Sequence, residues 1–143
     1  MSIRIARIRD EALSIQEHLD AVDDATAGAV ATFIGRVRDH DPEASTDVVA
    51  LEYTGHPDAE KTLAGIAQKA IDEAGGDAIV AVSHRIGKLG VGDLAVVIAV
   101  ASSHRDEAFT VCRDVIETIK RELPIWKRQF ESDGTGAWKG IGG

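Results

Sequence analysis

The fold is decided by residues 94–124, LAVVIAVASSHRDEAFTVCRDVIETIKRELP. The first eight of these residues are almost all apolar, which predicts a strand covered on both faces. Ser102 and Ser103 follow, and beyond them apolar residues recur with helical spacing, so Ser103 is expected to cap a helix. Pro124 cannot continue the backbone hydrogen bonds of a helix and therefore ends it. The stretch thus predicts a buried strand followed by an amphipathic helix.

Patterns on either side of this stretch predict the remaining elements. Helical spacing of apolar residues indicates helices, and runs of β-branched and aromatic residues indicate strands. Helices are expected at residues 10–24 and 56–76, strands at 29–38, 48–53, 78–83 and 125–132, a solvated loop or lid at 39–47, and a turn at 133–136 leading into 137–139. This order fits a single α+β domain over residues 1–143 better than a strictly alternating parallel sheet.

The composition excludes several classes of protein. A formal net charge of -8 argues against a general nucleic-acid binder, which needs an excess of Lys and Arg. Cys112 is the only cysteine, so it can form neither a disulfide within the chain nor a Cys-rich metal site, and we expect it to be buried. No signal peptide is recognisable, and no stretch has the roughly 18 to 20 apolar residues of a membrane span. We expect a cytoplasmic protein.

Basic residues nevertheless gather on three segments of this acidic chain. These are Arg36 and Arg38 at a strand end, His104 and Arg105 at a helix start, and Lys120, Lys127 and Arg128 near the C-terminus. Free amides and the helix dipole favour an anion at a helix start, so His104 and Arg105 indicate either an anion site or an ordinary polar helix start. The second HisArg pair, His84-Arg85, precedes a glycine-rich turn, and we interpret it as structural.

Lys120 lies at the margin of the apolar stripe of the last helix. Partial burial and neighbouring cations, for which we expect Lys127 and Arg105, would lower its pKa and suit it to act as a base or nucleophile. Alternatively, its aliphatic stem only covers the stripe. If residues 125–132 alternate as a strand, the Trp126 indole is expected in the core and the Lys127 ammonium in a cleft.

Five short motifs occur in an order typical of one family. They are GAVATFIGRVRDH at residues 28–40, LEY at 51–53, HRIG at 84–87, SHR at 103–105 and KRELPIWKR at 120–128. Over residues 28–138 the chain resembles the large, catalytic subunit of molybdopterin synthase, the MoaE family. This resemblance implies an α/β-hammerhead fold with an additional small antiparallel β-sheet.

The resemblance also implies an activity and its partners. Members form a homodimer within a heterotetramer and bind a small ubiquitin-like sulfur carrier of the MoaD type. The carrier's C-terminal Gly-Gly thiocarboxylate supplies sulfur to cyclic pyranopterin monophosphate, forming the dithiolene of molybdopterin. The resemblance implies no cofactor and no metal.

Family positions that contact the substrate can be matched residue by residue. They fall on Arg36, Val37, Arg38, His104, Arg105, Lys120, Lys127, Arg128 and Gln129. The resemblance implies that Lys120 and Lys127 are catalytic, Lys120 above all. Arg38, His104 and Arg105 can hold the phosphate and the carrier's carboxylate.

Three other interpretations stay open from the sequence. The chain could be a binding module that holds a phosphorylated small molecule or an acidic peptide tail without catalysis, or a scaffold for oligomerisation. The terminal Gly142-Gly143 raises the third, that the chain is itself a carrier, although flexible ends often have this composition.

Overall fold

Two four-stranded sheets and three helices make up the residues described by the structure, a computed structural model covering residues 2–41, 44, 46–134 and 136–139. The elements are, in order, β1 (Ile3–Arg9), α1 (Ile15–Ala21), β2 (Ala29–Arg36), β3 (Val48–Gly55), α2 (Ala59–Glu73), β4 (Ile79–Arg85), β5 (Gly87–Gly90), β6 (Leu94–Ser102), α3 (Arg105–Glu122), β7 (Ile125–Glu131) and β8 (Gly136–Lys139). The predicted α+β class, with an additional small antiparallel sheet, is confirmed. Gly142-Gly143 and part of the predicted loop at 39–47 lie outside the described residues.

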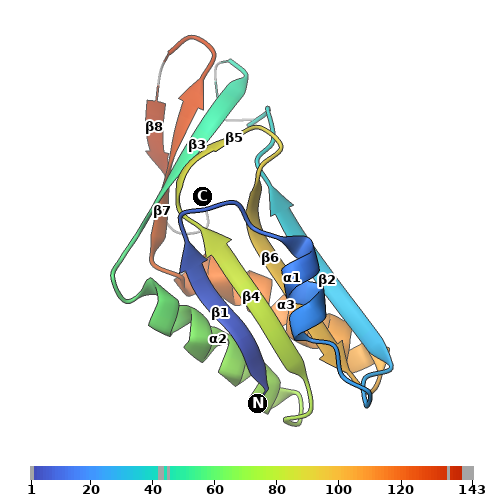
Figure 1. The fold of residues 1–143 in the computed structure, drawn as a ribbon. Helices are drawn as coiled ribbons and strands as arrows, with labels where there is room; N and C mark the ends of the chain where they lie inside the picture. Colours follow the sequence, from blue (N-terminus) through green and yellow to red (C-terminus); the bar gives the residue numbers. More distant parts are fainter. Residues whose placement is uncertain (1, 42–43, 45, 135, 140–143) are drawn as a thin grey trace.

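The first sheet carries the apolar core. Its strands have the order β1-β4-β6-β2, with β1 parallel to β4 and the other neighbours antiparallel. Helices α2 and α3 cover one face and α1 covers the other (Figure 1). Because side chains alternate between the faces of a strand, Val82 and Ile98 pack against α2 and α3, whereas Ala81 and Ala99 face α1. The prediction of strands covered on both faces is confirmed.

The first helix is shorter than predicted. It begins at Ile15 rather than at residue 10, because the Ser14 hydroxyl accepts a hydrogen bond from the Glu17 backbone N–H (3.1 Å) and caps the helix there. His18 in this helix is fully buried. Its Nδ1 donates to the Ser14 carbonyl (2.6 Å) and its Nε2 accepts from the Ser83 hydroxyl on β4 (2.8 Å). The imidazole therefore ties α1 to the first sheet.

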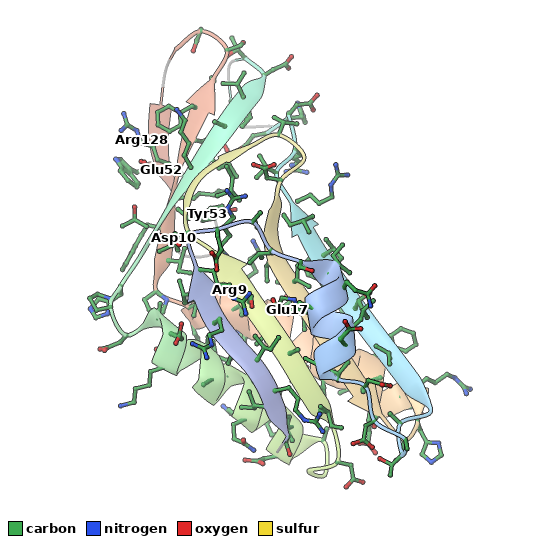
Figure 2. All side chains as sticks on the ribbon, viewed as in Figure 1. Arg9, Asp10, Glu17, Glu52, Tyr53 and Arg128 are labelled. Carbon is green, nitrogen blue, oxygen red and sulfur yellow. The ribbon has the colours of Figure 1, made fainter. Side chains whose placement is uncertain are left out.

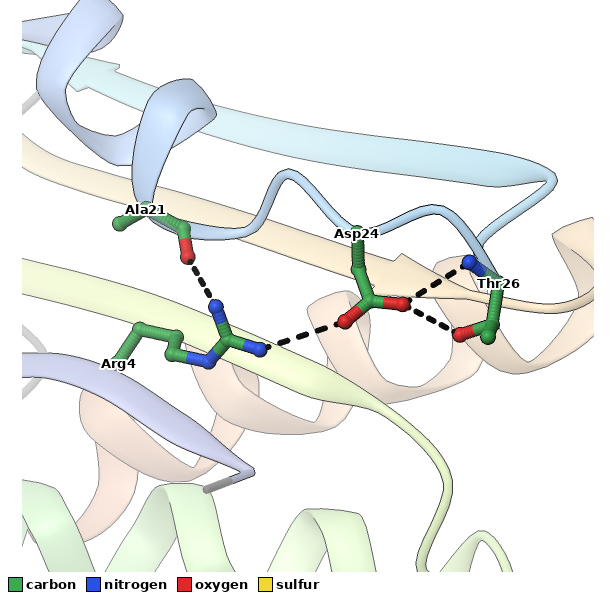
Figure 3. Close-up of polar contacts among 4 residues, drawn as sticks. All are labelled: Arg4, Ala21, Asp24 and Thr26. Atoms are coloured by element: carbon green, nitrogen blue, oxygen red, sulfur yellow. Dashed lines mark hydrogen bonds and ion pairs between the residues drawn. The ribbon is translucent and has the colours of Figure 1, made fainter.

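A polar cluster holds β1 against the segment between α1 and β2 (Figure 3). The Arg4 guanidinium donates to the Ala21 carbonyl (3.1 Å) and reaches one oxygen of the Asp24 carboxylate (3.5 Å). The other Asp24 oxygen accepts from the Thr26 backbone N–H (2.9 Å) and hydroxyl (2.5 Å), and these bonds lower the pKa of Asp24. The sequence patterns did not predict β1, which this cluster fixes at the edge of the sheet.

Helix α3 begins one residue later than predicted. The N-cap position is His104, with no side-chain cap, so the prediction that Ser103 caps the helix is wrong. Instead, the Ser102 hydroxyl donates to the Glu107 carboxylate in the first turn (3.1 Å). The buried stripe is as predicted, and it includes Cys112, whose pKa is raised by burial to about 11. The thiol is therefore protonated at neutral pH.

The second sheet has the strand order β5-β3-β7-β8 and is antiparallel throughout. Strand β5 was not predicted, since two of its four residues are glycines. Trp126 on β7 is 38% exposed, so the prediction that its indole anchors the core is wrong. On the same strand, the Arg128 guanidinium stacks on Phe130 (4.8 Å to the ring centroid) and lies 5.7 Å from the Trp138 ring centroid.

Among the described residues, no helix is long and apolar enough to cross a membrane.

Candidate anion-binding site

A pocket of about 240 Å³ opens where the second sheet meets the ends of β2 and α3. Its lining comes from four segments of the sequence: Arg36, Arg38, His40, Asp41, Val48, Leu51, Tyr53, Lys120, Lys127 and Gln129. Four of these side chains are cations and one is a carboxylate. In a chain with a net charge of -8, such a local excess of positive charge favours an anionic ligand.

The end of β2 presents the two arginines of the pocket. Between them, Val37 is buried and does not line the pocket. Its N–H donates to the Asp93 carbonyl (3.0 Å) and its carbonyl accepts from the Gly92 N–H (2.8 Å). Gly92 has φ +89°, and a Cβ there would lie 3.4 Å from Arg36 Nη2, so glycine suits both the turn and the space. Val37 thus anchors the backbone from which Arg36 and Arg38 project.

Lys120 comes from the last turn of α3, which ends at Glu122 just before Pro124. A cation is favourable there because the C-terminal end of a helix is its negative pole. The Lys120 side chain is exposed overall, yet the protein around its ammonium partly desolvates that group and lowers its pKa. The prediction that Lys120 is partly desolvated is confirmed, and its protonated form is less favoured than that of an ordinary surface lysine.

Strands β3 and β7 supply the floor of the pocket through their pairing register. Tyr53 lies opposite Lys127, and Leu51 lies opposite Gln129. Directly opposed residues in antiparallel strands place their side chains on the same face, so all four line the pocket together. The prediction that the Lys127 ammonium faces a cleft is confirmed.

Most cations of the pocket are not neutralised by the protein. Within the described ranges, Arg36, Arg38 and Lys120 make no ion pair and no side-chain hydrogen bond. Like charges that gather without counter-charges repel one another, and a bound phosphate or carboxylate relieves that repulsion. The electrostatics of the pocket therefore favour the binding of an anion.

Tyr53 and the buried His84 form an aromatic pair beside the pocket. Their rings are T-shaped, with centroids 5.0 Å apart and an interplanar angle of 77°. His84 Nδ1 donates to the Arg85 carbonyl (2.8 Å). Burial is the main cause that lowers the pKa of His84, to about 4, and the charge of Lys120 adds to it. His84 is therefore neutral at physiological pH.

Sequence reasoning missed Tyr53, His40 and Asp41 as members of the lining. His40 and Tyr53 belong to motifs that had been singled out, at residues 28–40 and 51–53, but neither was assigned a role. The alternation of β3 carried the missing signal, because Tyr53 shares a face with Leu51. No sequence signal placed Asp41 in the pocket.

The family model described as MoaE protein matches residues 8–122. The chain belongs to the MoaE family. It is 44% identical to molybdopterin synthase catalytic subunit 1 of Mycobacterium tuberculosis over 94% of this chain and 89% of that protein. It is also 43% identical to the molybdopterin synthase catalytic subunit of Halalkalibacterium halodurans, over 89% of this chain and 80% of that protein.

Solved MoaE-type structures share the fold. The crystal structure of molybdopterin synthase from Staphylococcus aureus superposes with a TM-score of 0.85 and 35% identity, covering 93% of this chain and 95% of that one. The MoaE protein from Burkholderia ambifaria gives a TM-score of 0.80 and 32% identity, covering 99% and 90% of the two chains. The fold expected from the resemblance is confirmed.

Three residues expected at a MoaE substrate site lie away from this pocket. His104 and Arg105 stand at the opposite end of α3 from Lys120, about 22 Å along a helix that rises about 1.5 Å per residue. The prediction that Arg105 neighbours Lys120 is therefore wrong within one chain. Arg128 stacks on Phe130 and lies outside the pocket lining (Figure 2).

Among the described residues no group of three or more His, Cys, Asp or Glu side chains is placed to hold a metal.

Proposed function

We propose that this chain is the catalytic subunit of a molybdopterin synthase. It transfers sulfur from the thiocarboxylated C-terminal Gly-Gly of a small ubiquitin-like carrier to cyclic pyranopterin monophosphate. The observation that carries the proposal is the pocket in which Arg36, Arg38 and Lys120 remain without counter-charges in the described chain. Both substrates of this reaction are anionic at their reacting ends, which matches that electrostatic field. The reducing cytoplasm is the compartment we propose.

The pocket's residues have distinct tasks in this reaction. Arg36 and Arg38 bind the cyclic phosphate or the carrier terminus, since guanidinium groups bind such oxygens in a bidentate manner. The thiocarboxylate sulfur attacks an oxygen-bearing electrophilic carbon of the pterin, the C–O bond of that carbon breaks, and the oxygen leaves as a phosphate oxygen or as water. The sulfur then joins the pterin to the carrier as a thioester. Water then adds to the thioester carbonyl, and collapse of the adduct breaks the C–S bond, leaving sulfur on the pterin and a carboxylate on the carrier.

Lys120 and Lys127 act on the charge that develops during this sequence. Each ammonium donates to the oxyanion of the tetrahedral adduct, where a fixed donor stabilises the transition state more than the ground state. The lowered pKa of Lys120 brings its proton affinity closer to neutrality, so this amine also shuttles protons more readily than an ordinary lysine. Gln129 and Val37 support the site, the first from its floor and the second through the backbone.

We assign His104 and Arg105 to the pocket of a second copy of the chain. Because α3 separates them from the pocket of their own chain, they serve a substrate only where a partner subunit brings its α3 N-terminus to this pocket. A homodimer within a heterotetramer meets that requirement. Arg128 acts on the pocket indirectly, because its guanidinium contacts Trp138 on β8 as well as Phe130 on its own strand and so helps to hold β7 against β8.

A reconstitution tests the proposal. The purified chain is mixed with a thiocarboxylated carrier and cyclic pyranopterin monophosphate, and the oxidised, fluorescent form of the pterin product is followed over time. We expect product in proportion to the thiocarboxylate consumed. Binding of the pterin phosphate without any sulfur transfer, with a carrier that is competent elsewhere, would replace this proposal by the non-catalytic binding module.

A further inference from the structure

We propose that Tyr53 is a further substrate-contacting residue of the pocket, whose hydroxyl donates to an anionic oxygen, and that His84 is the residue that positions it. This inference rests on the proposed function and deepens it. The oxygen belongs either to the carrier's C-terminal carboxyl group or to the cyclic phosphate of the pterin. Both are acceptors of the same kind, and the experiment below separates them.

The first step is the location of Tyr53. It is half-buried on β3 where the two sheets meet, and it faces Lys127 across the β3–β7 pair (Figure 2). Its side chain lines the pocket together with Lys120 and Lys127. A ligand held by the two ammonium groups is therefore also in contact with this ring.

The second step concerns the hydroxyl. Within the described part of the chain, the Tyr53 hydroxyl makes no hydrogen bond, while its ring contacts His84 and packs against the neighbouring apolar clusters. Arg36, Arg38, Lys120 and Lys127 are donors without any acceptor atom on the charged group. A phenol among such donors has its proton available for a ligand. Burial raises the pKa of Tyr53, so the phenol keeps that proton at neutral pH.

The third step is the role of His84. Its ring stands nearly perpendicular to that of Tyr53, at 5.0 Å between centroids, and its own orientation is fixed by the bond from Nδ1 to the Arg85 carbonyl. His84 is buried at the end of β4 in the first sheet. The pair thus connects a pocket residue of the second sheet to the buried first sheet. A neutral imidazole does this without adding a further cation beside Lys120.

The main test removes one oxygen atom. Tyr53→Phe keeps the ring and its contact with His84, and we expect the rate of sulfur transfer to fall about 10- to 100-fold, as for loss of one hydrogen bond to a charged group. A rise in KM for the carrier assigns the bond to the carrier terminus, a rise in KM for the pterin assigns it to the phosphate, and a fall in kcat alone assigns it to the transition state. Thr54→Val removes a hydroxyl from the opposite, exposed face of β3 and is the matched control.

Positioning by His84 is tested by a double-mutant cycle. His84→Ala is expected to lower kcat/KM in the parent background but to add little in the Tyr53→Phe background, since its effect passes through the Tyr53 hydroxyl. His84→Phe, which keeps a ring against Tyr53, is expected to recover most of the rate. Full additivity of His84→Ala and Tyr53→Phe would overturn the positioning role.

A second measurement uses the parent protein and does not depend on turnover. Tyr53 is the only tyrosine of the chain, so ¹³C-tyrosine labelling gives a single ring signal in NMR. We expect unlabelled carrier to shift this signal, carrier lacking its terminal Gly-Gly to leave it in place, and inorganic phosphate to shift it if the phosphate is the acceptor. An unmoved signal together with parent kinetics for Tyr53→Phe overturns the inference, whereas absence of sulfur transfer by the parent chain counts against the proposed function.

Discussion

The two sheets of this molecule are built on opposite principles. In the first sheet, nearly every side chain of β4 and β6 is buried, and the helices pack on it. Burial lowers the pKa of His18 on α1 and of His84 on β4, so both imidazoles in this part of the molecule are neutral at physiological pH. The second sheet instead carries Lys127 and Gln129 on its pocket face and exposed Trp126 on the other. Stability is concentrated in the first sheet and its helices, and anion chemistry in the pocket between the second sheet and the ends of β2 and α3.

The largest effect is expected from the pocket. Lys120→Ala removes the ammonium proposed to stabilise the oxyanion, and we expect sulfur transfer to fall about 1,000-fold, the upper range for loss of one such donor. Thermal stability should change little, because the ammonium is not part of the core. Arg121→Ala, one residue further on the exposed face of α3, is the control and should keep parent activity. Retained activity of Lys120→Ala with a thiocarboxylated carrier would contradict the catalytic role assigned to the pocket.

The next effect belongs to the first sheet. Ile98→Ala on β6 leaves a cavity beneath α2 and α3, and the free energy of unfolding should fall by about 3 kcal/mol. Val49→Ala on β3, where the side chain is 48% exposed, should change it by less than about 0.5 kcal/mol. Urea unfolding measures both. Equal losses of unfolding free energy at the two positions would show that Val49 on the second sheet contributes to stability as much as Ile98 in the core.

A pH dependence of stability of similar or smaller size is expected from His84. Its pKa is 6.5 when unfolded and about 4 when folded, so above pH 6.5 both states are neutral and its stabilisation is fully present. As pH falls from 6.5 to 4 the unfolded state takes up the proton first, and up to about 3 kcal/mol is lost. Urea unfolding at pH 7.5 and 4.5 should show a smaller loss for His84→Phe than for the parent. An identical loss in both would mean that His84 does not titrate in this way.

The smallest of these effects concerns the two ends of α3. Arg105→Ala should lower activity about 10-fold if a second copy contributes this residue to the pocket. Mixing Arg105→Ala with Lys120→Ala should then restore about a quarter of parent activity, because each mixed dimer regenerates one intact pocket. A mixture no more active than the average of the two variants would leave Arg105 outside the site.

The sequence predicted the first sheet better than the second, for physical reasons. A strand buried on both faces needs a nearly continuous apolar run, and residues 94–101 provide it. Strand β5 contains Gly87 and Gly90 and owes its conformation to pairing with β3, which local propensity does not encode. In β1, IRIARIR, arginines alternate with apolar residues except at Ala6; this broken period of two was the available signal, and it was overlooked.

The sequence predicted which charged residues form the site better than it predicted where those residues lie. Charge and family motifs together identified Arg36, Arg38, Lys120, Lys127 and Gln129, which the structure brings to one pocket. Trp126 was misplaced because strand alternation says which residues share a face but not which face is covered. Arg105 and Lys120 are far apart because α3 is long. The helix predicted from the sequence already included both residues, so this distance could have been inferred from it.

The central claim is that the pocket between the second sheet and the ends of β2 and α3 carries out sulfur transfer. A single-turnover experiment with ³⁵S-labelled thiocarboxylated carrier, cyclic pyranopterin monophosphate and an excess of the parent chain tests it most directly. The account predicts that the label moves from carrier to pterin with the parent chain and stays on the carrier with folded Lys120→Ala. Label remaining on the carrier with the parent, or moving equally fast with both chains, would contradict it.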